Sequence, residues 1–80
     1  MKVSIHSIQK TLYEGSAEKL ICRTPQGQIT VLNDHIPLIT KIMGPVVIAQ
    51  GPGGKRHEVA LSGGILEVRP ESEVVILADS

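Results

Sequence analysis

Turn-forming residues divide this chain into short segments, and this punctuation constrains the fold more than any other feature. Gly, Pro, Asn-Asp and Ser-Gly signals recur at intervals of about eight to twelve residues. Between them, apolar residues either alternate with polar ones, as at Val3 and Ile5, or form short runs such as residues 46–49. A helical stripe never exceeds one turn before Gly or Pro intrudes. The pattern therefore predicts an all-β fold.

The kind of apolar residue supports the same fold class. The chain has ten Ile and eight Val but seven Leu, and Tyr13 is its single aromatic residue. Ile and Val are branched at Cβ, which disfavours helix slightly and suits the pleated surface of a sheet. A length of 80 residues allows one domain, 1–80. We expect a small β-sandwich or flattened barrel of about ten short strands.

The expected strands lie between the turn signals. Residues 43–45 are expected to separate two strands, residues 51–54 to form a loop tip, and residues 62–64 to form a turn. The continuously apolar run 46–49 is expected to be buried on both faces. From the alternation we place strands at residues 2–6, 12–15, 17–23, 28–32, 38–42, 46–49, 55–61, 65–68 and 74–77.

Charge and composition exclude several classes of protein. Eight basic residues balance eight acidic ones, and the single aromatic side chain offers no set of stacking platforms for bases, so nucleic-acid binding is disfavoured. Cys22 is the single cysteine, so it forms neither an internal disulfide nor a Cys-x-x-Cys metal site, and a reducing compartment is expected. The sequence contains no apolar window of about 18 residues and no apolar leader, so neither a transmembrane segment nor an export signal is expected.

Two motifs that resemble catalytic or nucleotide-binding sites each miss essential residues. Residues 60–64 approach the G-x-S-x-G nucleophile turn around Ser62, but an alanine replaces the first glycine and a strand follows instead of a helix. Residues 49–56 resemble a phosphate-binding loop, yet Ala49 and Arg56 occupy the positions of its first glycine and its magnesium-binding hydroxyl. We therefore interpret both segments as hairpin turns.

The titratable side chains form no evident catalytic or metal-binding pattern. His6, His35 and His57 lack the close pairing of structural zinc sites, which leaves a three-histidine site as a minor alternative. The eight acidic residues show no pairing typical of a general acid and base. His35 lies in a turn between apolar segments, where either a partner contact or a local turn role is expected. The sequence predicts a protein that is not an enzyme and needs no metal or cofactor.

Three longer motifs resemble one known family. Residues 27–40 read GQITVLNDHIPLIT and resemble the G-E-F/L-G-V-L-P-G-H-A-P-L-L-T segment of the epsilon subunit of the F-type ATP synthase. Residues 62–68 match that family's S-G-G-I/F-L-E-V, and residues 74–79 match its V-x-V-L-A-D ending. Residues 13–15 also resemble its aromatic-x-Gly turn. The motifs follow the family's order and cover nearly the whole chain.

The resemblance implies a fold, a function and two sets of contacts. The family's amino-terminal domain is a β-sandwich that acts as a non-catalytic rotor part, between the γ subunit and the membrane ring of c subunits. It is peripheral to the cytoplasmic face of the bacterial membrane, or the equivalent organelle membrane, and is not expected to form a homo-oligomer. The implied contacts with the c-ring are Gln28, Asn33, Asp34, His35 and Pro37, and those with γ are Ser7, Thr40, Gly63, Gly64 and Ile65.

The chain departs from the family pattern at several positions. Gln28 replaces the family's usual acid, Asn33-Asp34 replaces Pro-Gly, and Gly44-Pro45 inverts the commoner order. The sequence stops at Ser80, where family members continue into two helices that inhibit ATP hydrolysis, so that activity is expected to be absent. The alternative reading of the same composition is a generic β-sandwich adaptor, whose exposed sheet edge accepts a strand from a partner.

Overall fold

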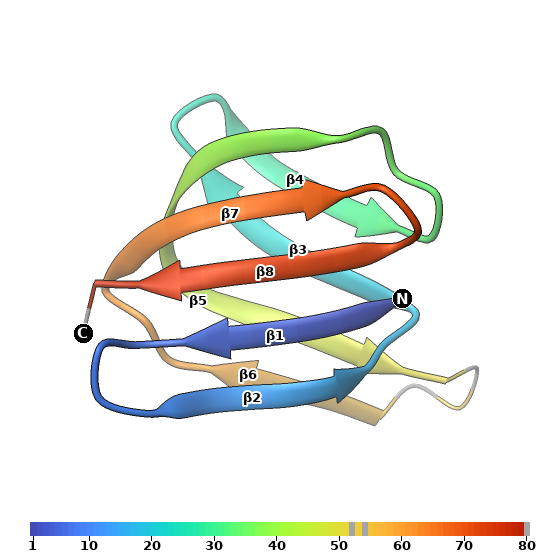
Figure 1. Ribbon diagram of the computed structural model, residues 1–80, viewed down its shortest axis with the longest axis horizontal. Coiled ribbons are helices and arrows are strands. Elements are labelled where there is room, and N and C mark those ends of the chain that lie inside the picture. Colours follow the sequence, from blue (N-terminus) through green and yellow to red (C-terminus); the bar gives the residue numbers. More distant parts are fainter. Residues whose placement is uncertain (52, 54, 80) are drawn as a thin grey trace.

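The computed structural model describes residues 1–51, 53 and 55–79, and these residues form an eight-stranded sheet without a helix (Figure 1). The all-β fold predicted from the sequence is therefore confirmed. The strands are β1 (Lys2–His6), β2 (Thr11–Ser16), β3 (Lys19–Thr24), β4 (Gly27–Leu32), β5 (Leu38–Gln50), β6 (Lys55–Val59), β7 (Gly63–Arg69) and β8 (Glu73–Ala78).

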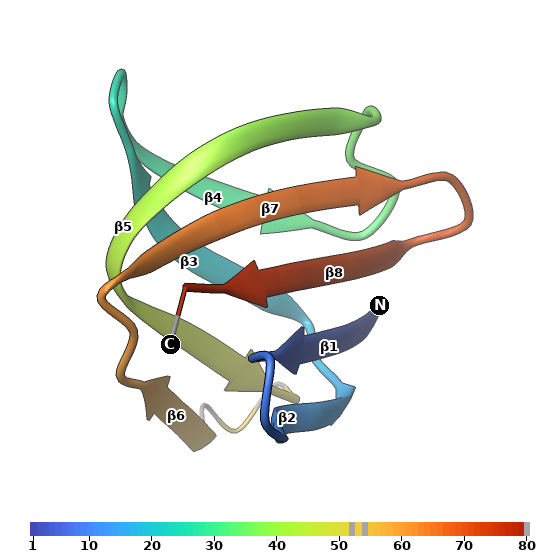
Figure 2. The ribbon, with the colours of Figure 1, turned by 60° about the vertical axis from the view of Figure 1, so that its left-hand side comes forward.

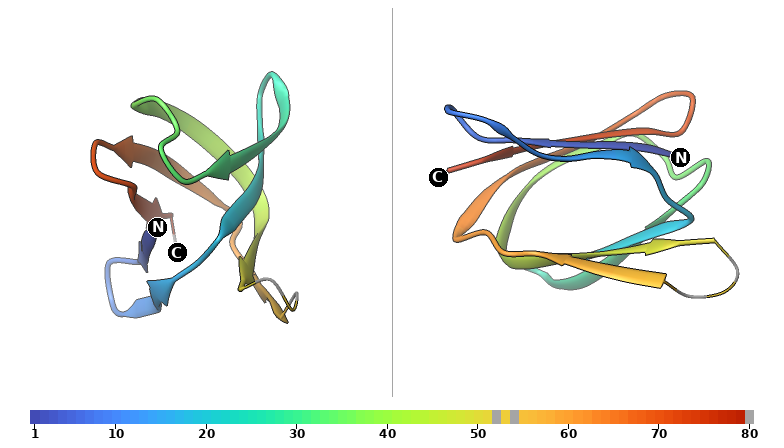
Figure 3. Two further views of the ribbon diagram at one scale, coloured as in Figure 1. Left: turned by 90° about the vertical axis from the view of Figure 1, so that its right-hand side faces the viewer. Right: turned by 90° about the horizontal axis from the view of Figure 1, so that it is seen from below.

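One hydrogen-bonded path connects the strands and folds over into two layers. Its order is β2-β1-β8-β7-β5-β3-β4, with β6 attached to β5. β1 and β8 run parallel, and the other pairs run antiparallel. Figure 3 shows β1, β2, β7 and β8 in one layer, and β3 and β6 with the second half of β5 in the other. The result is a small sandwich.

β5 belongs to both layers, and here the predicted strand boundaries were wrong. Strands were expected at residues 38–42 and 46–49 with a break between them, but Leu38–Gln50 is one strand of 13 residues. Gly44 adopts a φ of 71°, and the pairing with β3 shifts register opposite it, so the strand bends without ending (Figure 2). This merger turns the nine strands placed from the alternation into the eight observed, fewer than the expected total of about ten.

Other predicted boundaries differ by a few residues. β7 begins at Gly63, within the segment expected to be a turn, because that residue already pairs with Met43 of β5. β6 ends at Val59 rather than at residue 61. The predicted loop tip 51–54 includes Pro52 and Gly54, which lie outside the described residues; Gly51 has a φ of 67°, as a turn requires.

The core lies between the two layers and consists mainly of branched aliphatic side chains. Val3 and Ile5 are fully buried, as their alternation predicted, and Val46, Ile48 and Ala49 confirm that the run 46–49 is largely buried on both faces. The remaining buried apolar residues are Ala17, Leu20, Cys22, Val31, Ile42, Leu61, Leu66, Val68, Val74, Ile76 and Ala78.

Side-chain contacts help to connect the β2 edge to the second layer. The Gln50 Nε2 amide donates a hydrogen bond of 2.6 Å to the Tyr13 hydroxyl oxygen. The ring of Tyr13 also lies 6.2 Å from the ring of His57 on β6, measured between centroids. The one aromatic residue therefore helps to close the sandwich at its open side.

Candidate functional site

The loop after β4, residues 33–37, is a structured turn at one end of the sandwich. Asp34 adopts a φ of 62°, a left-handed conformation that Asp tolerates better than most residues. The His35 backbone N–H donates to the Leu32 carbonyl oxygen over 3.2 Å. His35 is half-buried, and its Nδ1 lies 2.7 Å from the Ile36 carbonyl oxygen, which can only accept, so Nδ1 is the donor. The local turn role considered for His35 is thus present.

Further hydrogen bonds tie this loop to the neighbouring strands. The Asp34 N–H donates to the Ser72 Oγ over 3.1 Å, and the Ser72 hydroxyl lies 3.3 Å from the Asp34 Oδ1. The Asn33 Oδ1 accepts a hydrogen bond of 2.6 Å from the Met1 amino group. Ile36 remains 75% exposed at the tip. The hydrogen bonds therefore hold the start of the loop in place, while the apolar side chain of Ile36 is exposed at its tip.

Gln28 does not join the other residues of the predicted ring contact. It lies near the beginning of β4, directly opposite Arg23 on β3. At roughly 3.3 Å per residue, the strand separates Gln28 from Asn33 by about 16 Å. The structure thus brings residues 33–37 together at one end of β4 and leaves Gln28 near the other.

Most of the predicted γ contacts lie at the opposite end of the sandwich from residues 33–37. Ser7 follows β1, and Gly63 begins β7 (Figure 1). Asp79 lies between them, because its N–H donates to the Gly63 carbonyl oxygen over 2.9 Å and its side chain lines surface hollows with both Ser7 and Ile65. Thr40 is separate: it is half-buried within β5, opposite Leu66.

Ser7 and Gly64 have structural tasks that the sequence motifs did not indicate. The Ser7 hydroxyl oxygen accepts hydrogen bonds from the N–H groups of Gln9 and Lys10, at 3.3 and 3.2 Å, and so fixes its own loop. Gly64 is buried, and a Cβ added to it would overlap the Leu77 carbonyl oxygen. The absence of a side chain at Gly64 therefore allows β7 and β8 to approach closely.

An exposed apolar surface covers the outer side of β5, β7 and β8. It comprises Ile39, Met43, Ile65 and Leu77, which are 70%, 45%, 39% and 58% exposed, and we call it the outer apolar face. Ile65 lies directly opposite Leu77 on β8 and Lys41 on β5, so these strands present one continuous face. Sequence reasoning identified Ile65 alone, because both alternating sets of residues in the first half of β5 contain apolar side chains and neither is marked as the outer one.

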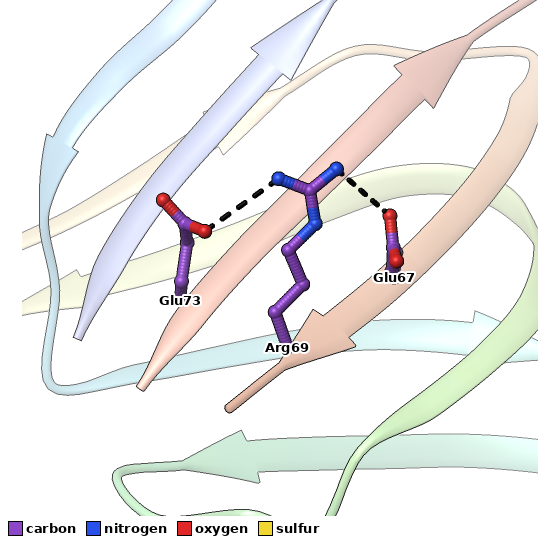
Figure 4. Close-up of polar contacts among 3 residues, drawn as sticks. All are labelled: Glu67, Arg69 and Glu73. Atoms are coloured by element: carbon purple, nitrogen blue, oxygen red, sulfur yellow. Dashed lines mark ion pairs between the residues drawn. The ribbon is translucent and has the colours of Figure 1, made fainter. Parts of the chain in front are cut away.

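A small ion-pair network lies where β7 ends and β8 begins. The Arg69 guanidinium contacts the carboxylates of Glu67, at 3.0 Å, and Glu73, at 3.5 Å (Figure 4). Hydrogen bonding and charge from Glu67, and then from Glu73, raise the pKa of Arg69 above its ordinary value. The group is exposed, so it orients the ends of β7 and β8 rather than adding much stability.

The histidines do not converge on one site. The His6 Nδ1 lies 3.2 Å from the Thr11 Oγ1, His57 faces the Tyr13 ring, and His35 contacts its own loop. Within residues 1–51, 53 and 55–79, no group of three His, Cys, Asp or Glu side chains is placed to hold a metal ion. Ser62 lies in the connection between β6 and β7, where its carbonyl oxygen accepts from the Gly44 N–H over 3.4 Å.

Cys22 is buried, and desolvation raises the pKa of its thiol from the ordinary 9.0 to about 11. This rise lowers the thiolate fraction at pH 8 about a hundredfold. We expect iodoacetamide at pH 8 to alkylate the native protein at least about fiftyfold more slowly than the urea-unfolded chain. Because the unfolded thiol ionises first, the free energy of unfolding should also fall as the pH rises from 9.0 through about 11. Equal alkylation rates for the native and the unfolded chain would contradict the burial of Cys22 and the raised pKa of its thiol.

None of the described residues belongs to a helix of the length and apolarity that a membrane crossing needs. The fold and its surfaces define a small all-β sandwich domain with a structured loop at one end and an outer apolar face. Residues 1–80 match the family described as ATP synthase, Delta/Epsilon chain, beta-sandwich domain, and the chain belongs to this family. The family identified from the sequence motifs is therefore confirmed.

Relatives and solved structures agree with this membership. The chain is 37% identical to an ATP synthase epsilon chain of Chromobacterium violaceum and 36% identical to one of Brevibacillus brevis, in each case over its whole length. It spans 57% and 60% of the length of those relatives.

Two cryo-EM structures show the same fold. A chain of the Euglena gracilis mitochondrial ATP synthase, solved as OSCP/F1/c-ring, aligns with a TM-score of 0.86 at 20% identity, covering 98% of this chain and 49% of that one. A chain of the Tetrahymena thermophila mitochondrial ATP synthase central stalk and c-ring aligns at 0.77 and 14% identity, covering 99% of this chain and 63% of that one.

Proposed function

We propose that this chain acts as the β-sandwich part of an epsilon-type central-stalk subunit in a rotary F-type ATP synthase. The observation that carries the proposal is the match of the entire chain to the epsilon β-sandwich family, together with epsilon-chain relatives at 37% and 36% identity. In this role the domain is not catalytic. It couples the γ subunit to the c-ring and associates with the cytoplasmic face of the bacterial membrane, or its organelle equivalent, through the complex.

A rotor coupling part must transmit force between two partners without deforming, and the sandwich suits this task. Residues 33–37 and the group formed by Ser7 and residues 63–65 lie at opposite ends of the domain. We assign the first group, together with Gln28, to the c-ring and the second, with Thr40, to γ. The outer apolar face adjoins Ile65, so we extend the γ contact over it. Exposed apolar side chains gathered on one face of a sheet are typical of protein interfaces.

The adaptor alternative is not favoured by the comparisons, and one of the exposed edges also opposes it. β6 is an edge strand that carries Lys55, Arg56 and Glu58, all exposed. Charged side chains on an edge strand discourage the addition of another strand.

Replacing Leu77 with glutamate should weaken binding of γ by at least about tenfold, because a charge would be buried in the centre of the proposed interface. The matched control is Leu32→Glu, since Leu32 is 53% exposed on β4, which pairs with β3 of the other layer. Affinity for the γ subunit and c-ring of the same source is measured by co-sedimentation in mild detergent. Failure of the unchanged protein to bind either partner would refute the proposal, and equal losses for both variants would refute the γ face.

A further inference from the structure

The loop after β4 begins with a tight turn whose residues suit its conformation poorly. The His35 N–H donates to the Leu32 carbonyl oxygen over 3.2 Å, which closes a four-residue β-turn. Asp34, the third residue of this turn, has a φ of 62°, whereas the φ of Asn33, the second, is not positive. Type II turns have this pattern, and they favour proline in the second position and glycine in the third. Asn33 and Asp34 therefore do not specify the turn on their own.

The support for this turn comes from Ser72, in the connection between β7 and β8. The Asp34 N–H donates to the Ser72 Oγ over 3.1 Å, and the Ser72 hydroxyl donates to the Asp34 Oδ1 over 3.3 Å. The two residues are 38 positions apart in the sequence, and Figure 1 shows both connections at the same end of the sandwich. One serine side chain thus binds the backbone and the side chain of the residue that has the unfavourable conformation.

Ser72 is itself held in an uncommon conformation. Glu71 and Ser72 have φ values of 66° and 57°, so two successive residues other than glycine are left-handed. Such a conformation persists only where the surrounding structure imposes it, and positions of this kind gather at functional sites. The Lys2 N–H donates to the Ser72 carbonyl oxygen over 2.9 Å, so the beginning of β1 fixes the Ser72 backbone. The position of the Ser72 hydroxyl is therefore set by the sheet and not by the loop that it contacts.

We propose that Ser72 is a positioning residue for the contact with the c-ring: it holds Asp34 in the left-handed conformation and so sets the direction in which His35 and Ile36 leave the turn. The inference rests on the proposed function, in which residues 33–37 face the ring. Ile36 is 75% exposed and follows the turn directly, so a change of backbone conformation at Asp34 would redirect it. Asp34 then serves the contact through the shape of the loop, because its N–H and its Oδ1 are both bonded to Ser72.

The first test uses the isolated chain and needs no partner. Ser72→Gly removes the hydroxyl, while glycine accepts a φ of 57° without strain. Glu71→Gly is the matched control, because Glu71 is an exposed left-handed residue of the same turn. Amide hydrogen exchange at Asp34, followed by NMR, should accelerate at least about fivefold in Ser72→Gly and stay unchanged in Glu71→Gly. The thermal midpoints of the two variants should agree within about 3 °C. Equal exchange rates at Asp34 in both variants would overturn the inference.

The second test measures binding of the c-ring to the assembled γ–epsilon pair. Ser72→Gly should weaken ring binding about threefold in the unchanged chain, because the loop then samples other conformations. The same substitution should have no effect in a chain that also carries Asn33→Pro and Asp34→Gly, since proline and glycine form the turn without help. An equal loss in both chains would show that Ser72 does not act through the turn and would overturn the inference.

The two tests also separate this inference from the proposed function. If the unchanged γ–epsilon pair fails to bind the ring, the proposed function is refuted, and the exchange rate of the Asp34 amide still decides whether Ser72 holds the loop. If the unchanged pair binds the ring and Ser72→Gly binds it equally well, the proposed function stands and Ser72 is not a positioning residue.

Discussion

Replacing Leu66 with alanine is expected to lower the free energy of unfolding by about 3 kcal/mol. Leu66 is fully buried on β7, between Thr40 of β5 and Ile76 of β8. Removing the outer carbons of the Leu66 side chain leaves a cavity. The surrounding strands cannot move in to fill it, because hydrogen bonds to their neighbours hold them in place. A chain of 80 residues has a total stability of roughly 4 to 12 kcal/mol, so the loss is a large fraction of it. Urea unfolding followed by far-UV circular dichroism measures the change.

The neighbouring residue supplies the control for this prediction. Ile65 precedes Leu66 on the same strand but points to the outer apolar face and is 39% exposed. Ile65→Ala should cost less than about 1 kcal/mol in stability, since the site is open to solvent and leaves no cavity. Similar losses of stability at Ile65 and Leu66 would contradict the assignment of inner and outer faces.

The inward face could be predicted wherever one set of alternating positions is polar. Val3 and Ile5 alternate with Lys2, Ser4 and His6, so the buried set of β1 follows directly from the sequence. The first half of β5 is different, because both of its alternating sets contain isoleucine. The structure buries Ile42 and leaves Ile39 exposed, a choice made by packing against β7 that no local pattern contains.

Two features could not be predicted from the sequence, for physical reasons. They are the bend within β5 and the separation of Gln28 from the other residues expected to contact the ring. Gly44 and Pro45 are ordinary signals for the end of a strand, but pairing with β3 on one side and with β6 and β7 on the other keeps the segment extended. Gln28 belongs to the same motif as residues 33–37, yet an extended strand carries successive residues apart. Proximity in a motif therefore did not give proximity in space.

Gly64→Ala is the second substitution with a large expected effect, a loss of about 2 to 3 kcal/mol in the free energy of unfolding. The added Cβ would overlap the Leu77 carbonyl oxygen and would lie 3.0 Å from the Ala78 Cα. Both atoms belong to the backbone of β8, directly across from Gly64, so no side-chain rotation relieves the overlap. The two strands must separate locally, and the amide hydrogen exchange of Ile65 and Leu77 should accelerate.

A matched glycine and a binding measurement separate packing from recognition at this position. Gly53 has no atom within 4 Å of an added Cβ, so Gly53→Ala should change stability by less than about 0.5 kcal/mol. The resemblance implied that Gly64 contacts γ, whereas its burial against β8 gives it a role within the fold. If Gly64→Ala kept its full stability but lost γ binding, a contact with γ would be the reason that glycine occupies this position. If stability and γ binding fall together, and binding returns at a temperature where the variant is fully folded, close approach of β7 and β8 is the reason that no side chain is tolerated at this position.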